Sequence, residues 1–162
     1  MISSIFKYTL LFNLLFTLTC YRLSFAENIY DTYINSRFSY TLKYPKDIFY
    51  PQGEADNGDG QKFLSKDKKS TITVYGGYNI ENKSIKTLYQ DYINNLNTKT
   101  TKITYTFLKS DYSFISGYTN DLIFYKKTTL KNDVEMTLLI EYPIAQRLIY
   151  DKIINKIANN FP

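Results

Sequence analysis

Three carboxylates lie close together in one glycine-rich segment, where they could ligate a cation. Glu54, Asp56 and Asp59 fall within six residues, and hard cations such as Ca²⁺ bind oxygen-rich loops of this kind. The spacing departs from that of an EF-hand loop, because counting from Asp56 places Gly58 at the third position and Asp67 at the twelfth. A tight turn before a strand explains the same glycines. The sequence therefore favours a turn and leaves weak cation binding by Glu54, Asp56 and Asp59 as the alternative.

Serine and lysine are the other groups that could do chemistry. Ser116 could act as a nucleophile if Lys126 or Lys127 served as its base. Nothing in the spacing ties these residues together, and a serine on an aromatic strand is more often a small packing residue. We expect no catalytic residue, and an enzyme of unknown reaction that uses carboxylate, serine or lysine chemistry is the alternative.

Two residue types that carry much of enzyme chemistry are almost absent. The chain has no histidine, so the usual general base at neutral pH is missing. Its single cysteine, Cys20, lies in the N-terminal segment discussed below. Without histidine, and with one cysteine that lies in that segment, zinc and copper sites built on imidazole or thiolate are excluded. We expect no cofactor.

The first 26 residues are typical of a cleavable signal peptide. Lys7 is followed by an apolar run over 8–20, and 24–26 (Ser-Phe-Ala) supplies small residues at the two positions that a signal peptidase reads. An uncleaved anchor is the alternative, but polar residues interrupt the run within the roughly 20 residues that a membrane span needs. The residues before Cys20 do not fit a lipoprotein signal. We therefore predict export, to a periplasm or beyond the cell, of a single domain over 27–162.

The charge of the exported part is weakly basic. Removing Lys7 and Arg22 lowers the net charge from +5 to +3. The lysines are scattered among acidic neighbours, whereas a nucleic-acid footprint gathers basic residues on one face. We therefore expect no nucleic-acid partner, and contact with a membrane only through an uncleaved signal segment.

Apolar periodicity predicts strands followed by helices in two places. Alternation predicts strands at 38–44, 62–65, 71–75, 103–107, 112–118, 121–130 and 134–142. An i, i+3, i+4 pattern predicts a helix over 85–96 with Ser84 as its N-cap. A terminal helix is predicted after Pro143, with Asp151 as a possible second start. Residues 46–60 are expected to be irregular, and 131–133 should form a hairpin turn.

These elements predict an α+β fold, a mainly antiparallel sheet of six or seven strands covered by two or three helices. Their order over residues 37–161 resembles the sandwich fold of the PsbP family of extrinsic photosystem II proteins and their bacterial relatives. The segments 37–45 (RFSYTLKYP) and 63–76 also look like a family of small exported bacterial proteins of uncharacterised function. The resemblance implies a scaffold that binds or stabilises partners, and it carries over no active site.

We therefore expect an exported, non-catalytic accessory or binding domain of the cell envelope, or a secreted one. Its partner would be a protein or a small ligand that the sequence does not identify. The sequence also leaves the oligomeric state open.

Overall fold

The computed structural model describes residues 28–162. The signal peptide predicted over 1–26 and Cys20 lie outside the described residues, so cleavage and export stay predictions. Within 28–162, no helix has both the length and the apolar character that a membrane crossing requires.

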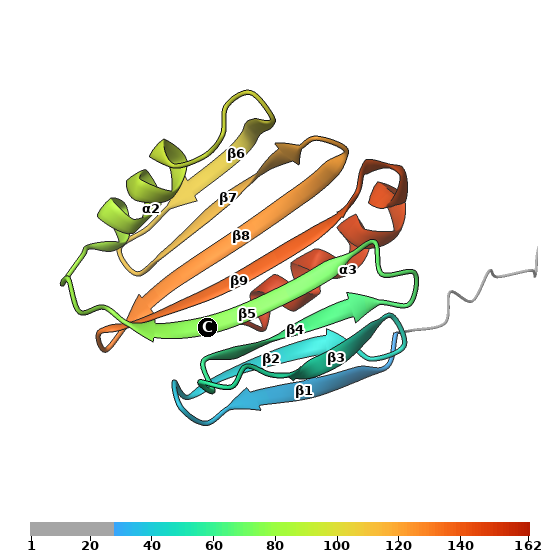
Figure 1. Ribbon diagram of the computed structural model, residues 1–162, viewed down its shortest axis with the longest axis horizontal. Helices are drawn as coiled ribbons and strands as arrows, with labels where there is room; N and C mark the ends of the chain where they lie inside the picture. The colour runs from blue at the N-terminus through green and yellow to red at the C-terminus, as the bar shows by residue number, and fades with distance from the viewer. Residues whose placement is uncertain (1–27) are drawn as a thin grey trace, which may run out of the picture.

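The main sheet has seven strands, all antiparallel to their neighbours, in the order β3-β4-β5-β9-β8-β7-β6 (Figure 1). The strands are β3 (Phe49–Glu54), β4 (Gly60–Ser65), β5 (Thr71–Tyr78), β6 (Thr101–Leu108), β7 (Tyr112–Thr119), β8 (Leu122–Lys131) and β9 (Val134–Pro143). The sequence-based prediction of an α+β fold with a mainly antiparallel sheet is confirmed.

The hairpin between β8 and β9 forms as predicted. Lys131 lies opposite Val134, and the two residues between them, Asn132 and Asp133, have φ angles of 51° and 58°. Positive φ at both central residues matches the right-handed twist of the flanking strands. This turn fixes the register of the two longest strands.

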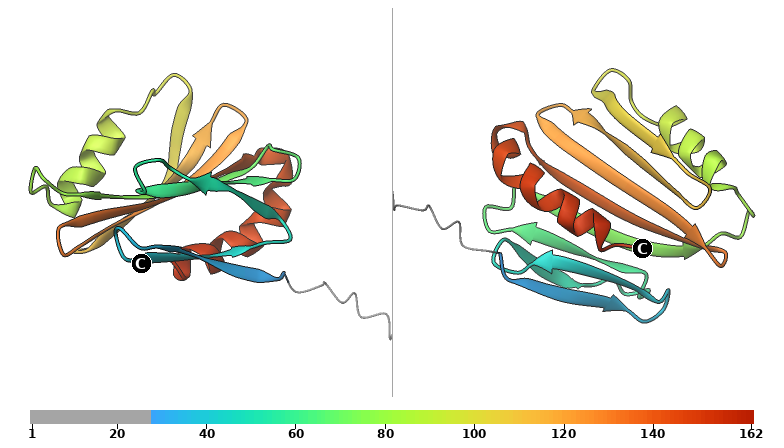
Figure 2. Two further views of the ribbon diagram at one scale, coloured as in Figure 1. Left: turned by 60° about the horizontal axis from the view of Figure 1, so that its bottom comes forward. Right: turned by 180° about the vertical axis from the view of Figure 1, so that it is seen from behind.

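A second sheet consists of β1 (Tyr30–Asn35) and β2 (Tyr40–Pro45), paired with each other. The predicted alternation of β2 is confirmed, since Tyr40, Leu42 and Tyr44 are buried. The left view of Figure 2 shows this pair on the same side of the main sheet as the C-terminal helix.

One prediction about the N-terminal part of the domain was wrong, and one strand there was not predicted. Residues 46–60 are not an irregular loop throughout, because Phe49–Glu54 forms edge strand β3. Phe49 is its only buried residue, and Pro51 and Gly53 accompany a register shift, so the strand shows no apolar alternation. Strand β1 was not predicted either, because its side chains are mostly exposed or half-buried.

Helix α2 (Ile85–Asn94) contacts β7 and β8 on one face of the main sheet. Its predicted cap is confirmed, because the backbone N–H of Thr87 donates to Ser84 Oγ at 3.1 Å. Ile85 is the only buried residue of this helix. The helix is therefore held to the sheet chiefly by half-buried side chains.

The C-terminal segment consists of a short 3₁₀ turn, η1 (Ile144–Gln146), and helix α3 (Arg147–Asn159). The predicted split into a turn and a main helix is confirmed, but the second start at Asp151 was wrong. Helix α3 begins at Arg147, and Asp151 lies one turn further on, where its carboxylate accepts from other side chains.

The main core lies between the sheet, α3 and the β1–β2 pair. Helix α3 buries Tyr150, Ile153, Ile154, Ile157 and Ala158 in it. The opposite face of the sheet carries a smaller apolar contact with α2. Figure 2 shows α2 on one side of the sheet and α3 with β1–β2 on the other. Successive side chains along each central strand therefore point alternately into the main core and toward the face that carries α2.

Candidate functional site

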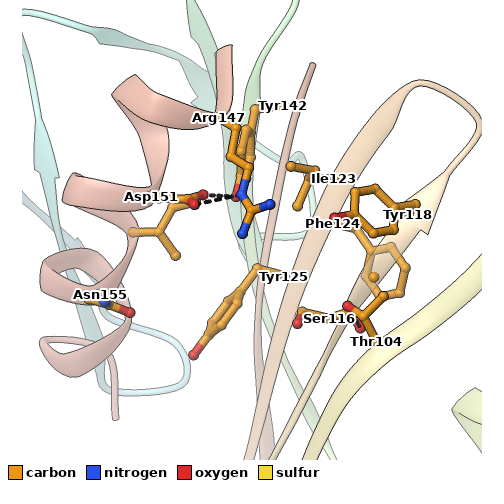
Figure 3. A pocket seen from close by; sticks show the side chains of 12 residues that line it. Thr104, Ser116, Tyr118, Ile123, Phe124, Tyr125, Tyr142, Arg147, Asp151 and Asn155 are labelled. Carbon is orange, nitrogen blue, oxygen red and sulfur yellow. Dashed lines mark hydrogen bonds and ion pairs between the residues drawn. The ribbon is translucent and has the colours of Figure 1, made fainter. Parts of the chain in front are cut away.

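A cleft of about 270 Å³ lies between α3 and the strands β6 to β8. We call it the helix–sheet cleft. Arg147, Asp151 and Asn155 line it from α3, at spacings of four residues that place them on one face of the helix. Figure 3 shows these three side chains opposite the side chains of the strands. The cleft is thus walled by one helix face and one sheet face.

Arg147 and Asp151 form an ion pair at the mouth of the cleft. The Arg147 Nε–H donates to Asp151 Oδ2 at 2.9 Å, and the Tyr142 hydroxyl donates to Asp151 Oδ1 at 2.7 Å. Both carboxylate oxygens are therefore engaged. Burial and the neighbouring Asp151 charge raise the pKa of Tyr142, so its hydroxyl stays a donor to the carboxylate.

The outer nitrogens of Arg147 are the strongest free donors of the cleft. The only hydrogen bond of this guanidinium within residues 28–162 is the one made by Nε. In Figure 3 the guanidinium points away from α3, toward the strand side chains and above Tyr125. Its two Nη groups form a planar fork that suits a carboxylate or another acceptor-bearing group.

Hydroxyl groups line the sheet side of the cleft. Ser116 and Tyr118 come from β7 and Tyr125 from β8, where it lies opposite Ser116 in the strand register. Burial raises the pKa of Tyr125 to about 12, so its hydroxyl is protonated and can donate a hydrogen bond at neutral pH. The cleft therefore combines one cation, one satisfied carboxylate and several hydroxyl groups.

A β-bulge shapes the outer wall of the cleft. The register of β6 and β7 shifts between Ile103 and Tyr105, which turns Thr104 toward the cleft. Gly117 makes this close approach possible, because a Cβ there would lie 2.1 Å from the Lys102 carbonyl oxygen. The Thr104 hydroxyl donates to the Ser116 carbonyl at 3.4 Å. Sequence analysis missed this bulge, although the glycine was visible.

The structure does not pair Ser116 with a lysine. Ser116 lies in the helix–sheet cleft, whereas Lys126 points to the other face, where its ammonium lies 4.6 Å from the centre of the Tyr92 ring on α2. Lys127 shares a face with Ser116 but donates to the carbonyls of Ala158 at 3.2 Å and Phe161 at 2.7 Å. Neither ammonium is placed as a base for the serine.

Two of the three carboxylates considered as cation ligands are engaged separately, and the third is exposed. Glu54 Oε1 accepts from the Tyr33 hydroxyl at 2.7 Å and from Asn35 Nδ2 at 2.9 Å. Asp59 Oδ2 accepts from a neighbouring asparagine, and Asp56 lies exposed in the turn between β3 and β4. Within residues 28–162, no group of three metal-ligating side chains gathers at one point. Cation binding at this loop stays an untested alternative to the turn that the sequence favours.

Lys126 is a second unusual residue, which sequence analysis considered only as a base. It is 8% exposed, and its ammonium donates to Thr128 Oγ1 at 2.5 Å. Burial lowers the pKa of Lys126 to about 8, and Glu135 opposes the shift only in part. No sequence signal could have found this, because the burial comes from α2, which crosses the strand from a distant part of the chain.

Comparison with known proteins shows the fold and no more. No protein-family model matches this sequence, and no match was found among curated proteins. Among solved structures, the fold is similar to the solution structure of cyanobacterial PsbP (CyanoP) from Synechocystis sp. PCC 6803, with a TM-score of 0.63. The two sequences are 9% identical over 86% of this chain and 95% of the other. The chain thus has a PsbP-like α+β fold, and its place in a family of small exported bacterial proteins stays a prediction.

Proposed function

We propose that this protein is an exported, non-catalytic binding domain, periplasmic or secreted, that holds a small carboxylate-bearing ligand in the helix–sheet cleft. The observation that carries the proposal is the Arg147 guanidinium, which engages Asp151 through Nε and leaves its outer fork toward the cleft. A bidentate contact to a carboxylate would use both outer nitrogens.

The other groups of the cleft support binding rather than turnover. Tyr125 and Ser116 offer hydroxyls that could orient the rest of a ligand. Asp151 has both oxygens engaged, and no second carboxylate lines the cleft. A general acid and base pair, which most hydrolytic reactions need, is therefore lacking along these walls. The volume of about 270 Å³ suits a ligand of a few carbon atoms.

The binding test is a titration with a panel of small acids, namely succinate, malate, citrate and galacturonate. Calorimetry measures the binding, and NMR shifts show whether the cleft residues are affected. We expect at least one of them to bind and to be released unchanged. Arg147→Gln should weaken that binding by about tenfold or more, the effect of a lost charge-assisted bond.

The matched control is Arg37→Gln, which removes the only other arginine among the described residues, one that lies against Phe38 and the Asn57 carbonyl. It should leave the affinity unchanged. If no acid of the panel binds, or if Arg37→Gln and Arg147→Gln act equally, the cleft is not a carboxylate site. If a bound acid were converted to a product, the protein would be an enzyme and the proposed non-catalytic role would be wrong.

The exported location rests on residues 1–26 and needs its own test. Fractionation of the producing cells and intact mass measurement should recover a soluble species that begins at Glu27 outside the cytoplasm. Full-length protein in the membrane fraction would indicate an anchored domain. Full-length protein in the cytoplasm would overturn the proposed location and would leave the proposal of a carboxylate ligand in the cleft unaffected.

A further inference from the structure

The outermost strand of the sheet, β6, has an open edge. It pairs with β7 on one side and has no strand on the other within residues 28–162. The bulge interrupts its first half, but Tyr105 to Leu108 pair regularly with β7. Every second backbone N–H and C=O of a strand edge points outward, where another strand can pair with it. The second half of β6 is therefore a regular template for an added strand.

Apolar side chains lie exposed beside this edge. Tyr105, Phe107 and Leu108 are 54%, 36% and 38% exposed. Tyr105 and Phe107 lie opposite Ser116 and Phe114 and share the face of the sheet that carries the cleft. Phe107 and Phe114 have ring centres 6.3 Å apart. The spacing of Tyr105 and Phe107 matches the alternate side chains of an extended peptide laid along the strand.

The charge along this strand is positive. Lys102 and Lys109 stand at its two ends with no carboxylate between them, and Asp111 follows in the turn before β7. The Lys109 ammonium lies 5.8 Å from the centre of the Phe107 ring and 5.5 Å from that of Tyr112, so a cation stands next to the exposed rings. An added strand would meet one lysine before Tyr105 and one after Leu108.

We propose that Tyr105–Leu108 of β6 docks an extended acidic segment of a partner protein by β-strand addition. The backbone of the segment would pair with the open edge, its alternate apolar side chains would cover Tyr105 and Phe107, and its flanking carboxylates would lie near Lys102 and Lys109. A second copy of this chain is a poorer occupant, because its own β6 brings Lys102 and Lys109 again with no carboxylate between them. This surface adjoins the cleft, because Tyr105 lies opposite Ser116, but none of residues 105–108 lines the cleft.

The test is a selection from a random library of displayed ten-residue peptides against the purified protein. Selected peptides should be rich in aspartate and glutamate and should carry apolar residues at alternate positions. NMR titration of one such synthetic peptide should move the amides of Tyr105–Leu108. Phe107→Ser and Lys109→Glu should each lower the affinity for this peptide by about fivefold or more.

The control for Lys109→Glu is the same charge reversal in the exposed turn between β4 and β5, Lys66→Glu. It should leave the peptide affinity unchanged. Melting temperatures equal to that of the parent protein would show that the exposed variants fold. The proposal is overturned if selection enriches no acidic peptides, or if the selected peptides bind β6 variants as well as the parent. Sedimentation that showed dimers broken by Phe107→Ser would assign the edge to a second copy instead.

Discussion

At the scale of single residues, Lys126 and Lys127 show how one step along a strand changes the role of a side chain. Both are 8% exposed. Lys127 reaches one carbonyl in the last turn of α3 and one just after the helix, whereas Lys126 lies beneath α2 with one hydroxyl as its hydrogen-bond acceptor. Burial lowers the pKa of both ammonium groups, but removal of Lys127 also leaves two carbonyls without their donor, so the two contributions to stability should differ in sign.

Lys126→Met should stabilise the protein at pH 7. Because burial lowers the pKa of Lys126 to about 8 from 10.5, the folded state holds this proton more weakly than the unfolded chain. The charged lysine therefore costs stability below pH 8, and the cost falls as the pH rises from 8 toward 10.5. We expect a gain of roughly 1–3 kcal/mol in the free energy of unfolding at pH 7 that shrinks by pH 10. Denaturant unfolding at both pH values measures it, and a loss of stability at pH 7 would contradict it.

Lys127→Met should instead destabilise the protein. It removes two charge-assisted hydrogen bonds to the carbonyls of Ala158 and Phe161 and leaves those acceptors without their donor. The expected loss is about 1–3 kcal/mol in the free energy of unfolding. The Lys126→Met variant is the control for loss of charge alone. Equal effects of the two substitutions would show that the helix-end contacts contribute nothing.

Ca²⁺ should leave the melting temperature unchanged. Glu54 is held by Tyr33 and Asn35, and the carboxylates of the loop do not converge. Calcium sites take six to eight oxygen ligands, of which this loop would offer few. A calorimetric titration at millimolar Ca²⁺ checks the expectation. Heat of binding that is lost in Asp59→Asn would restore the cation hypothesis.

At the scale of elements, β6 depends on a glycine in its neighbour. A Cβ at position 117 would overlap the backbone of β6 at Lys102 and Ile103. Backbone cannot yield as a flexible side chain does, so β6 must separate from β7 or the bulge must rearrange. The outer wall of the cleft and the open edge both rest on this contact.

Gly117→Ala should therefore cost on the order of 1–3 kcal/mol in the free energy of unfolding. It should also speed hydrogen exchange of the β6 amides more than that of the β5 amides. Gly77→Ala on β5 is the matched control, because nothing lies within 4 Å of a Cβ placed there. Equal exchange in the two variants would show that the bulge tolerates a methyl group.

At the scale of the whole molecule, the C-terminus joins three layers. Phe161 is 3% exposed, its ring lies 5.8 Å from that of Tyr40 on β2, and its carbonyl accepts from Lys127 on β8. The Pro162 carbonyl accepts from Thr129 at 2.6 Å. The last two residues thus connect α3, the β1–β2 pair and the main sheet.

Phe161→Ala should lower the free energy of unfolding by about 3–5 kcal/mol, the usual cost of truncating a buried phenylalanine. The unfolding should stay a single transition, because the ring belongs to the one core that all three layers share. Leu148→Ala, at a side chain that is 85% exposed, should change little. A separate early transition of β1–β2 would show that the layers unfold independently.

The local elements were largely determined by the sequence, because their causes are local. Alternation of Tyr40, Leu42 and Tyr44 and the Asn132-Asp133 turn act over a few residues. Strand β3 could not be predicted from apolar alternation, because it is an edge strand in which only Phe49 is buried. The same holds for the half-exposed strand β1.

The candidate site was decided by the tertiary structure alone. Arg147 and Tyr125 are 22 positions apart, and they meet at the cleft because α3 folds back over the sheet. Ser116 and Lys126 are only ten positions apart in the sequence, and the side-chain alternation of β8 together with the sheet register places them on opposite faces. Local periodicity determines which face a side chain takes, whereas long-range packing determines what lies on that face.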